Sequence, residues 1–271
     1  MLNSRDLITP ENQPRYSMSI TSQADVIGLQ RISEAVGTTL KHMRAYAQPG
    51  MTTKELDEYG EQLLAALGAR SAPRLAYGFP GWTCISVNNE VAHGIPSARK
   101  VLQEGDLVNI DVSAELDGYW ADNGGSFVLG TDIHQHQPLV DASRQILRTA
   151  LGRIRGGVRI ADIGGLIEAE ARKAGFRVIN NLVGHGIGRS LHEEPSEIPC
   201  YYDRRNNKRF KTNSVVAVET FISTRASIAH QTNDGWTLVT KDGSFVAQHE
   251  HTILITNDHP IILTEANSIW E

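Results

Sequence analysis

Two carboxylates, Asp111 and Asp122, are spaced so that a tight turn would bring them together. The dipeptide Asp117-Gly118 between them is preferred in two-residue hairpin turns, because both central residues of a type I′ turn need a positive φ. This turn places Ser113 opposite Asp122, and Asp111 shares that face because side chains alternate along a strand. Two clustered carboxylates repel each other unless they share a proton or a cation. The hairpin therefore predicts a cation site; the alternative is that Asp122 only marks a solvated strand end.

Two further acids occur in similar settings. Glu219 ends an apolar run just as Asp111 does, and Glu250 stands in the middle of a strongly apolar strand pattern. A buried carboxylate is costly unless it is paired or coordinated. Alternation places the neighbouring His249 and His251 on the opposite face from Glu250, which argues against a histidine clamp at this point. Glu250 is thus a candidate ligand, with an exposed strand position as the alternative.

Three of the ten histidines stand out from the rest. His93 and His185 each follow an Asn-Asn-x-Val-x turn and precede a glycine, where the missing side chain lets backbone or ligand approach closely. His192 follows seven residues after His185. A lone histidine is usually a satisfied structural residue. Together with the acids, however, imidazoles suit Mn²⁺, Fe²⁺, Co²⁺ or Zn²⁺, and shared carboxylates suit a pair of ions. Such a pair can hold a hydroxide and polarise a carbonyl, which is the chemistry of amide hydrolysis.

Helical spacing of apolar residues predicts two pairs of helices behind these strands. They cover residues 21–46, 53–67, 146–154 and 162–174. The second helix has Thr52 and Thr53 as caps and Gly68 as its stop, and Gly175 stops the fourth helix. The two halves of the chain therefore present their elements in the same order.

An internal repeat accounts for this order. The motif around His93 recurs around His185 with six identities in eight positions, and the acids Asp111 and Glu219 end equivalent strands. This pattern predicts a duplication in which each half supplies helix, helix, a His-Gly turn and an acid-bearing strand. Under a pseudo-twofold axis, Asp111 would meet Glu219 and His93 would meet His185.

Composition sets the wider limits. A chain of 271 residues with 40% hydrophobic content has a substantial core, and its net charge of -5 with one short basic run argues against nucleic acid as a partner. Cys84 and Cys200 lie far apart, which favours a reducing compartment. The chain shows neither a signal-peptide pattern nor a long apolar span, so we expect a cytoplasmic protein. The expected organisation is an extended lead-in (1–20) and one catalytic domain (21–271) with pseudo-halves at about 21–140 and 141–271.

Several motifs in order resemble the type I methionine aminopeptidases over roughly residues 21–260. They are N-x-E-V-x-H-G-I-P (88–96), N-I-D-V (109–112), D-G-x-x-x-D (117–122), G-H-G-I-G-R-x-x-H-E-E-P (184–195), the acid strand at Glu219 and H-E-H-T (249–252). The resemblance implies the pita-bread fold, an α+β (mixed α/β) duplicated architecture with a central antiparallel sheet backed by helices. The short span from Glu219 to Glu250 leaves no room for the inserted subdomain of type II enzymes.

The resemblance also implies roles for individual residues. The family's five metal ligands fall on Asp111, Asp122, His185, Glu219 and Glu250, with Asp122 and Glu250 bridging two ions. His93 and His192 would contact the substrate and the developing tetrahedral centre. The implied reaction is removal of the N-terminal methionine from nascent polypeptides and peptides with a small second residue, by a metal-bound hydroxide with Glu219 as proton acceptor. A monomer with a transient ribosome contact and no membrane partner is expected.

The substrate pocket departs from the family pattern. Phe79, Cys84 and Trp236 would line the methionine pocket, although ordinary core packing is the alternative for Phe79 and Trp236. The positions that differ from the usual family residues are Ala76, Tyr77, Ala92, Leu191 and Thr220. Because these positions build the pocket in the family, the pocket shape stays open. The rival functions are an Xaa-Pro aminopeptidase of the same fold and a non-catalytic peptide-binding relative.

Overall fold

The computed structural model describes residues 20–271, and within them ten strands form one antiparallel sheet. Its main path runs β1-β4-β5-β12-β9-β7-β8. The strands on this path are β1 (Arg70–Ser71), β4 (Leu107–Leu116), β5 (Tyr119–Val128), β12 (Val246–Leu254), β9 (Val215–Ser223), β7 (Val183–Gly186) and β8 (Glu193–Pro199). Strands β2 (Cys84–Val87), β6 (Arg177–Val178) and β13 (Ile261–Ile262) pair at its margins, and β3 (Glu90–Ala92), β10 (His230–Gln231) and β11 (Leu238–Val239) form a small second sheet. The predicted lead-in lies outside the described residues except for Ile20.

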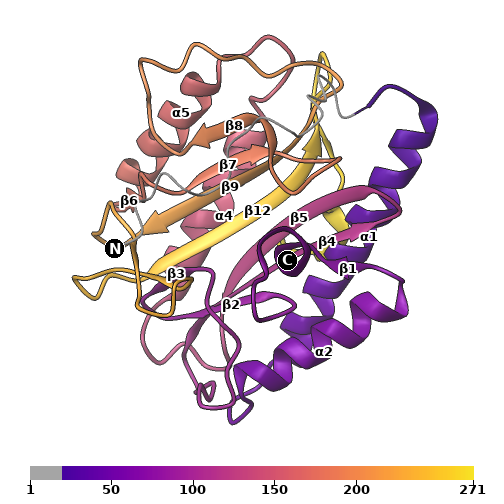
Figure 1. Cartoon of the computed structure of the whole chain (residues 1–271). Coiled ribbons are helices and arrows are strands. Elements are labelled where there is room, and N and C mark those ends of the chain that lie inside the picture. Colours follow the sequence, from indigo (N-terminus) through magenta and orange to yellow (C-terminus); the bar gives the residue numbers. More distant parts are fainter. Residues whose placement is uncertain (1–19) are drawn as a thin grey trace.

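Helices cover one face of the large sheet, as Figure 1 shows. They are α1 (Gln23–Tyr46), α2 (Thr53–Ala66), α4 (Gln137–Leu151) and α5 (Ile160–Lys173), and the short 3₁₀ turn η2 (Glu265–Asn267) contacts α1. The short helix α3 (Ala72–Tyr77) follows β1 directly. Ser22 and Thr52 cap α1 and α2 with complete capping boxes, so the predicted start of the second helix is confirmed. No helix within residues 20–271 has the length and apolar character of a membrane span.

The third predicted helix differs from the prediction at both ends. The helix expected over residues 146–154 is α4, which begins at Gln137 and ends at Leu151. Pro138 suits the first turn of a helix because its missing N–H has no partner there. The carboxylate of Asp132 accepts the backbone N–H groups of His136 and Gln137 at 2.8 and 2.9 Å, which satisfies free donors at the helix start. This start signal lies ahead of the apolar repeat, and the prediction missed it.

The predicted hairpin is confirmed. Strands β4 and β5 pair with Ser113 opposite Asp122 and Leu116 opposite Tyr119. The two turn residues have the positive φ values that the type I′ turn requires, 54° at Asp117 and 82° at Gly118. The turn therefore fixes the register that places the side chains of Asp111 and Asp122 on the same face of the hairpin.

The two faces of the sheet differ in chemistry. Val108, Ile110 and Val112 of β4 alternate toward α1 and join the main hydrophobic core, as do Val216 and Val218 of β9 on the side of α4. The residues between them point to the opposite face, where the acids stand. The amphipathic strands thus bury an apolar layer under the helices and leave a polar layer open for a site.

The duplication extends to individual hydrogen bonds. In the first half, Gly50 N donates to Leu102 O and Leu102 N donates to Met51 O, both at 2.8 Å. In the second half, Gly157 N donates to Phe210 O at 2.8 Å, and Phe210 N donates to Val158 O at 3.0 Å. Both glycines have positive φ values, 91° at Gly50 and 86° at Gly157. The predicted fold class, a duplicated mixed α/β fold with an antiparallel sheet backed by helices, is confirmed.

A seam runs between β5 and β12, where the strands of the two halves meet. These strands pair at one backbone register position, His249 opposite Gly125. Side chains supply further bonds: Thr252 Oγ1 donates to Asp122 O at 2.6 Å and accepts from Asp122 N at 2.9 Å. On the other side of that position, Ser126 Oγ accepts from Gln248 N at 2.9 Å. Polar side chains therefore hold the centre of the sheet together.

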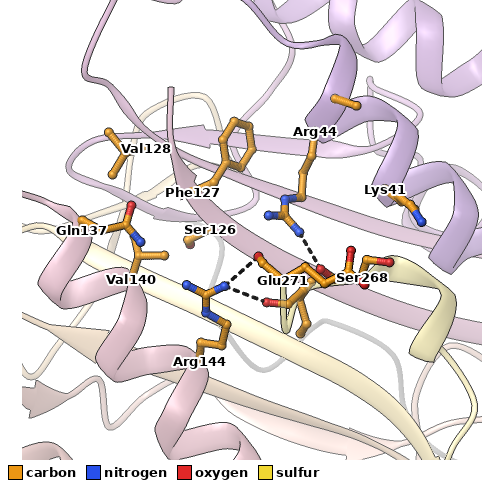
Figure 2. Close-up of a pocket in the computed structure, with 12 residues that line it drawn as sticks. Lys41, Arg44, Ser126, Phe127, Val128, Gln137, Val140, Arg144, Ser268 and Glu271 are labelled. Atoms are coloured by element: carbon orange, nitrogen blue, oxygen red, sulfur yellow. Dashed lines mark hydrogen bonds between the residues drawn. The ribbon is translucent and has the colours of Figure 1, made fainter. Parts of the chain in front are cut away.

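The chain end lies on the helix side of the sheet, between α1 and α4 (Figure 2). Arg144 donates to Glu271 O at 2.8 Å, and Arg44 donates to Ser268 O at 3.3 Å. A cavity of about 420 Å³ remains beside them, and it is lined by none of the predicted site residues. This cavity is therefore separate from the acidic face of the sheet.

Candidate metal centre

Four acidic side chains from four neighbouring strands meet on the open face of the sheet. Asp122 on β5 and Glu250 on β12 are the central pair and are buried, with 7% and 1% exposure. Asp111 on β4 and Glu219 on β9 flank them and are half-buried. Glu219 stands directly opposite Glu250, whereas Asp122 faces Ser113. Asp111 and Glu219, the acids that end equivalent strands of the repeat, therefore belong to one cluster. Its central positions are those of Asp122 and Glu250.

Burial and mutual repulsion oppose the ionisation of these acids. Burial raises the pKa of Asp111 to about 6. The pKa of Asp122 is raised well above its usual value by burial and then by the charges of Glu250 and Asp111. Burial, followed by the charge of a neighbouring acid, has the same effect on Glu219 and Glu250. A divalent cation would reverse this balance, because it favours the ionised form of each carboxyl group.

His185 completes the cluster as a neutral imidazole. Burial lowers its pKa to about 4. Its Nδ1 lies 3.0 Å from Gly186 O, so Nδ1 carries the proton and the lone pair of Nε2 is free. Nε2 lies 3.9 Å from Asp122 Oδ2. This tautomer is the one in which Nε2 can ligate a metal.

The donor set fits a divalent metal. One potential ligand atom from each of Asp122, His185 and Glu250 lies within 4.8 Å of the others. Asp122 Oδ1 is buried and has no hydrogen-bond partner among the described residues, although buried carboxylate oxygens are normally satisfied. Oxygen and imidazole donors of this kind suit Mn²⁺, Fe²⁺, Co²⁺ or Zn²⁺. Asp122 thus has one buried oxygen without a partner and a second oxygen 3.9 Å from an imidazole nitrogen, which is the arrangement expected of a metal-ligating carboxylate.

A second layer of polar residues, missed in the sequence, orients Glu250. Gln248 Nε2 donates to Glu250 Oε2 at 3.0 Å, and Asn109 Nδ2 donates to Gln248 Oε1 at 2.8 Å. Gly124 makes room for this pair, since a Cβ there would stand 2.3 Å from Gln248 Oε1. Asn109 and Gln248 each precede a predicted ligand by two residues. The period of two along a strand could have identified both residues.

His249 and His251 point away from the acids, as predicted. His249 Nδ1 lies 3.0 Å from Ser143 Oγ of α4, and His251 Nδ1 lies 2.8 Å from Thr264 Oγ1. Burial lowers the pKa of each ring to about 3, so both are neutral parts of the helix-side core. They therefore cannot reach the acids on the other face.

The histidines of the two repeated motifs differ in setting. His185 is buried within β7, whereas His93 is exposed just after β3, with a φ of 54°. The ring centroid of His192 lies 4.0 Å from that of His185. The pKa of His192 is lowered by burial, then by His185 and His93. His93 and His192 thus stand beside the cluster, and only His185 shares it with the acids.

The glycines after these two histidines are required by the backbone. A Cβ on Gly94 would stand 2.2 Å from Ile85 O, and one on Gly186 would stand 2.4 Å from Glu194 O. Gly94 O also accepts from Ile85 N at 2.9 Å. In both motifs the missing side chain therefore makes room for a neighbouring backbone segment.

Gly94→Ala should destabilise the protein by roughly 1–3 kcal/mol, because the clash is with a main-chain carbonyl that cannot rotate away. Urea denaturation measures the free energy of unfolding directly. Gly152→Ala is the matched control: its φ is -64°, and the nearest atoms to an added Cβ lie 3.6 Å away. An alanine at residue 94 that is tolerated as well as the control would contradict this assignment.

Of the three predicted pocket residues, Cys84 adjoins the acids, and Phe79 and Trp236 contact each other. Cys84 pairs with Asp111 across β2 and β4, and the charge of Asp111 adds to burial in raising the pKa of its thiol. The rings of Phe79 and Trp236 meet edge to face with centroids 5.2 Å apart. Phe79 is buried and Trp236 is half-buried. One aromatic wall thus joins the segment after α3 to the loop before β11.

The chain is similar in sequence to characterised metallopeptidases. The model of "Metallopeptidase family M24" matches residues 28–257. The methionine aminopeptidase 2 of Bacillus subtilis is 49% identical over 248 residues, which is 92% of this chain and 100% of that protein. A methionine aminopeptidase of Staphylococcus epidermidis is 42% identical, covering 92% of this chain and 99% of that one.

Solved structures agree with the sequence matches. Methionine aminopeptidase from Thermotoga maritima superimposes with a TM-score of 0.87 at 34% identity, over 91% of this chain and 99% of that chain. The prolidase from Pyrococcus furiosus has a TM-score of 0.73 at 19% identity, over 91% of this chain and 65% of that chain, and shows a shared fold alone. With a family match over most of its length and relatives aligned from end to end, the chain belongs to metallopeptidase family M24.

Proposed function

We propose that this metal-dependent peptide hydrolase removes the N-terminal methionine from nascent polypeptides and peptides, with preference for a small second residue. The observation that carries the proposal is the group formed by Asp122, Glu250 and the neutral imidazole of His185. It is flanked by Asp111 and Glu219, and Asp122 Oδ1 has no hydrogen-bond partner among the described residues. Relatives named methionine aminopeptidase, 49% and 42% identical, support the choice of methionine over other N-terminal residues.

Two divalent ions, Mn²⁺, Fe²⁺, Co²⁺ or Zn²⁺, are the proposed cofactors. The residues proposed to hold them are Asp111, Asp122, His185, Glu219 and Glu250. Asp122 and Glu250 occupy the two central strands, which suits the bridging role. When bound, such ions polarise a peptide carbonyl and lower the pKa of a water molecule.

The protein's own groups have distinct tasks in this proposal. Glu219 is half-buried at the flank of the cluster, and a bound cation would keep its carboxyl group ionised, so that it can take up the proton of the attacking water. His192 would donate a hydrogen bond to the carbonyl oxygen as negative charge develops on it. His93, exposed beside His192, would stabilise or carry the proton that the departing amide nitrogen needs.

The methionine side chain would bind against Phe79, Cys84 and Trp236. Cys84 pairs with Asp111, so a side chain held against Cys84 would leave its amine beside the acids. The edge-to-face contact of Phe79 and Trp236 would also serve ordinary core packing.

We place the protein in the cytoplasm as a single domain (residues 21–271) that acts as a monomer, with transient access to nascent chains at the ribosome. Its two cysteines are free and buried, which supports a reducing compartment. Strands from both pseudo-halves share one sheet, which supports one domain over two.

Peptide hydrolysis with controlled metal tests the proposal. The chelated protein should be inactive, and add-back of each of the four metals in turn should restore cleavage of Met-Ala-Ser with at least one of them. Ala-Pro-Ser should be left intact, since an Xaa-Pro enzyme would reverse that preference. Met-Lys-Ser should be cleaved more slowly than Met-Ala-Ser if the second residue must be small. A protein that binds Met-Ala-Ser under every metal condition but never cleaves it would instead support the non-catalytic alternative.

A further inference from the structure

Tyr77 ends α3 and reaches the edge of the site from a different part of the chain. Its hydroxyl lies 2.6 Å from Nδ1 of His192, and the two rings are tilted with centroids 5.7 Å apart. Burial, followed by the charge of Asp122, raises the pKa of Tyr77, so the phenol stays protonated at neutral pH. A proton donor is therefore fixed against one nitrogen of the histidine beside the acidic cluster.

The chemistry of the pair sets the direction of this hydrogen bond. A neutral imidazole has one N–H donor and one acceptor nitrogen. A phenol is a much better proton donor than acceptor, whereas an imidazole lone pair is a strong acceptor. The Tyr77 hydroxyl therefore donates to Nδ1, and the ring proton of His192 is then held on Nε2.

We infer that Tyr77 is a positioning residue that selects the Nε2–H tautomer of His192. This inference rests on the proposed function, in which His192 donates a hydrogen bond to the substrate carbonyl. With Nδ1 occupied by Tyr77, only Nε2 is free to make that bond. If the proton lay on Nδ1 instead, the free nitrogen would present a lone pair to the developing oxyanion and would repel it.

Both partners are anchored for this role. Gly78, at a φ of 72°, closes α3 with a bond from its N–H to Arg74 O at 3.0 Å, and Phe79 next to it is buried. On the other side, Ser190 Oγ donates to His192 O at 2.9 Å, and Leu191 is buried. The segment that carries each ring is anchored by a buried side chain, Phe79 near Tyr77 and Leu191 next to His192. This anchoring keeps the Tyr77 hydroxyl close to Nδ1 of His192.

The variant Tyr77→Phe removes the hydroxyl and keeps the ring. A neutral hydrogen bond contributes about 1 kcal/mol, so kcat on Met-Ala-Ser should fall about five- to tenfold while KM changes less than twofold. The same substitution in a His192→Ala background should have no further effect on kcat, because Tyr77 acts through that ring. Tyr46→Phe is the matched control, since Tyr46 stacks on Tyr59 and has similar exposure, 45% against 44%.

The ring nitrogens of His192 report the tautomer directly. In zinc-loaded protein with ¹⁵N-labelled histidine, the wild type should show a protonated Nε2 and an acceptor Nδ1, and Tyr77→Phe should show a mixture of tautomers. This readout does not depend on catalysis, so it separates a failure of the inference from a failure of the proposed function. An unchanged tautomer in Tyr77→Phe, or a loss of kcat that persists in the His192→Ala background, would overturn the inference.

Discussion

Asp122→Asn should abolish peptide hydrolysis and at the same time make the metal-free protein more stable. The two effects have one cause. Asp122 lies in the middle of four acids that oppose its ionisation, and its Oδ1 has no partner among residues 20–271. An amide removes the charge that a cation needs and also the charge that the neighbouring acids repel.

The loss of activity should be roughly a thousandfold or more, because metal ions contribute several kcal/mol to the transition state and each 1.4 kcal/mol is tenfold in rate. Metal content measured on the same sample should fall with the rate. The free energy of unfolding without metal should rise by roughly 1–2 kcal/mol, the range of ordinary stabilising substitutions. A variant that keeps both ions and the full rate would refute the ligand assignment.

Asp117→Asn is the matched control for this experiment. Asp117 lies on the same hairpin, but it is exposed in the turn and pairs with Arg31 at 3.0 Å on the surface. The substitution should leave rate and metal content unchanged, since an exposed ion pair contributes little. A control that behaves like Asp122→Asn would show that any change to the hairpin disturbs the site.

Chelated protein should lose stability as the pH rises from about 6.5 to 8, and bound metal should remove that loss. The acids have raised pKa values in the folded state, so above their unfolded values the folded chain holds protons that the unfolded chain has released. The slope is about 1.4 kcal/mol per pH unit for each proton retained.

The histidines act in the opposite direction, but only at lower pH. The pKa values of His185, His249 and His251 are lowered, so these rings add stability as the pH rises toward about 6.5, the unfolded value. Above it they are neutral in both states. Cys84 and Cys200, with raised pKa values, add a loss only as the pH nears 9.

Denaturation curves at pH 6.5, 7.25 and 8, with chelator and with saturating Mn²⁺, measure the effect. The chelated protein should lose roughly 1–3 kcal/mol over this range, and the loaded protein should not, because ligands in the complex are already deprotonated. The Asp122→Asn variant serves as the internal comparison and should show a smaller loss. Stability that stays level or increases with pH in chelator would contradict the raised pKa values of the acids.

The sequence predicted the features that depend on local chemistry. The turn at Asp117-Gly118 set the register of Asp111 and Asp122. Alternation along the strand placed Glu250 on the face of the sheet opposite to that of its neighbouring histidines. Capping residues likewise marked the start of α2. In each case the signal and the structure it determines lie within a few residues of each other.

The features that the sequence did not predict depend on contacts between distant segments. The central place of Glu250 follows from the pairing of β12 with β5, and the bond between Tyr77 and His192 joins residues 115 positions apart. The repeat predicted that His93 would meet His185 near a pseudo-twofold axis; in the structure His185 is buried with its ring against that of His192, whereas His93 is exposed. A motif duplicated in sequence does not retain its environment when the segments around it pair differently.

The seam between β5 and β12 suggests that metal binding would also stabilise the contact between the two halves of the sheet. These central strands share one backbone register position, His249 opposite Gly125, and otherwise rely on side chains such as Thr252. A cation held by both Asp122 and Glu250 would cross-link the two strands at this place. The free energy of metal binding would then also resist separation of the two halves of the sheet. Metal binding and association of the two halves would therefore be thermodynamically coupled.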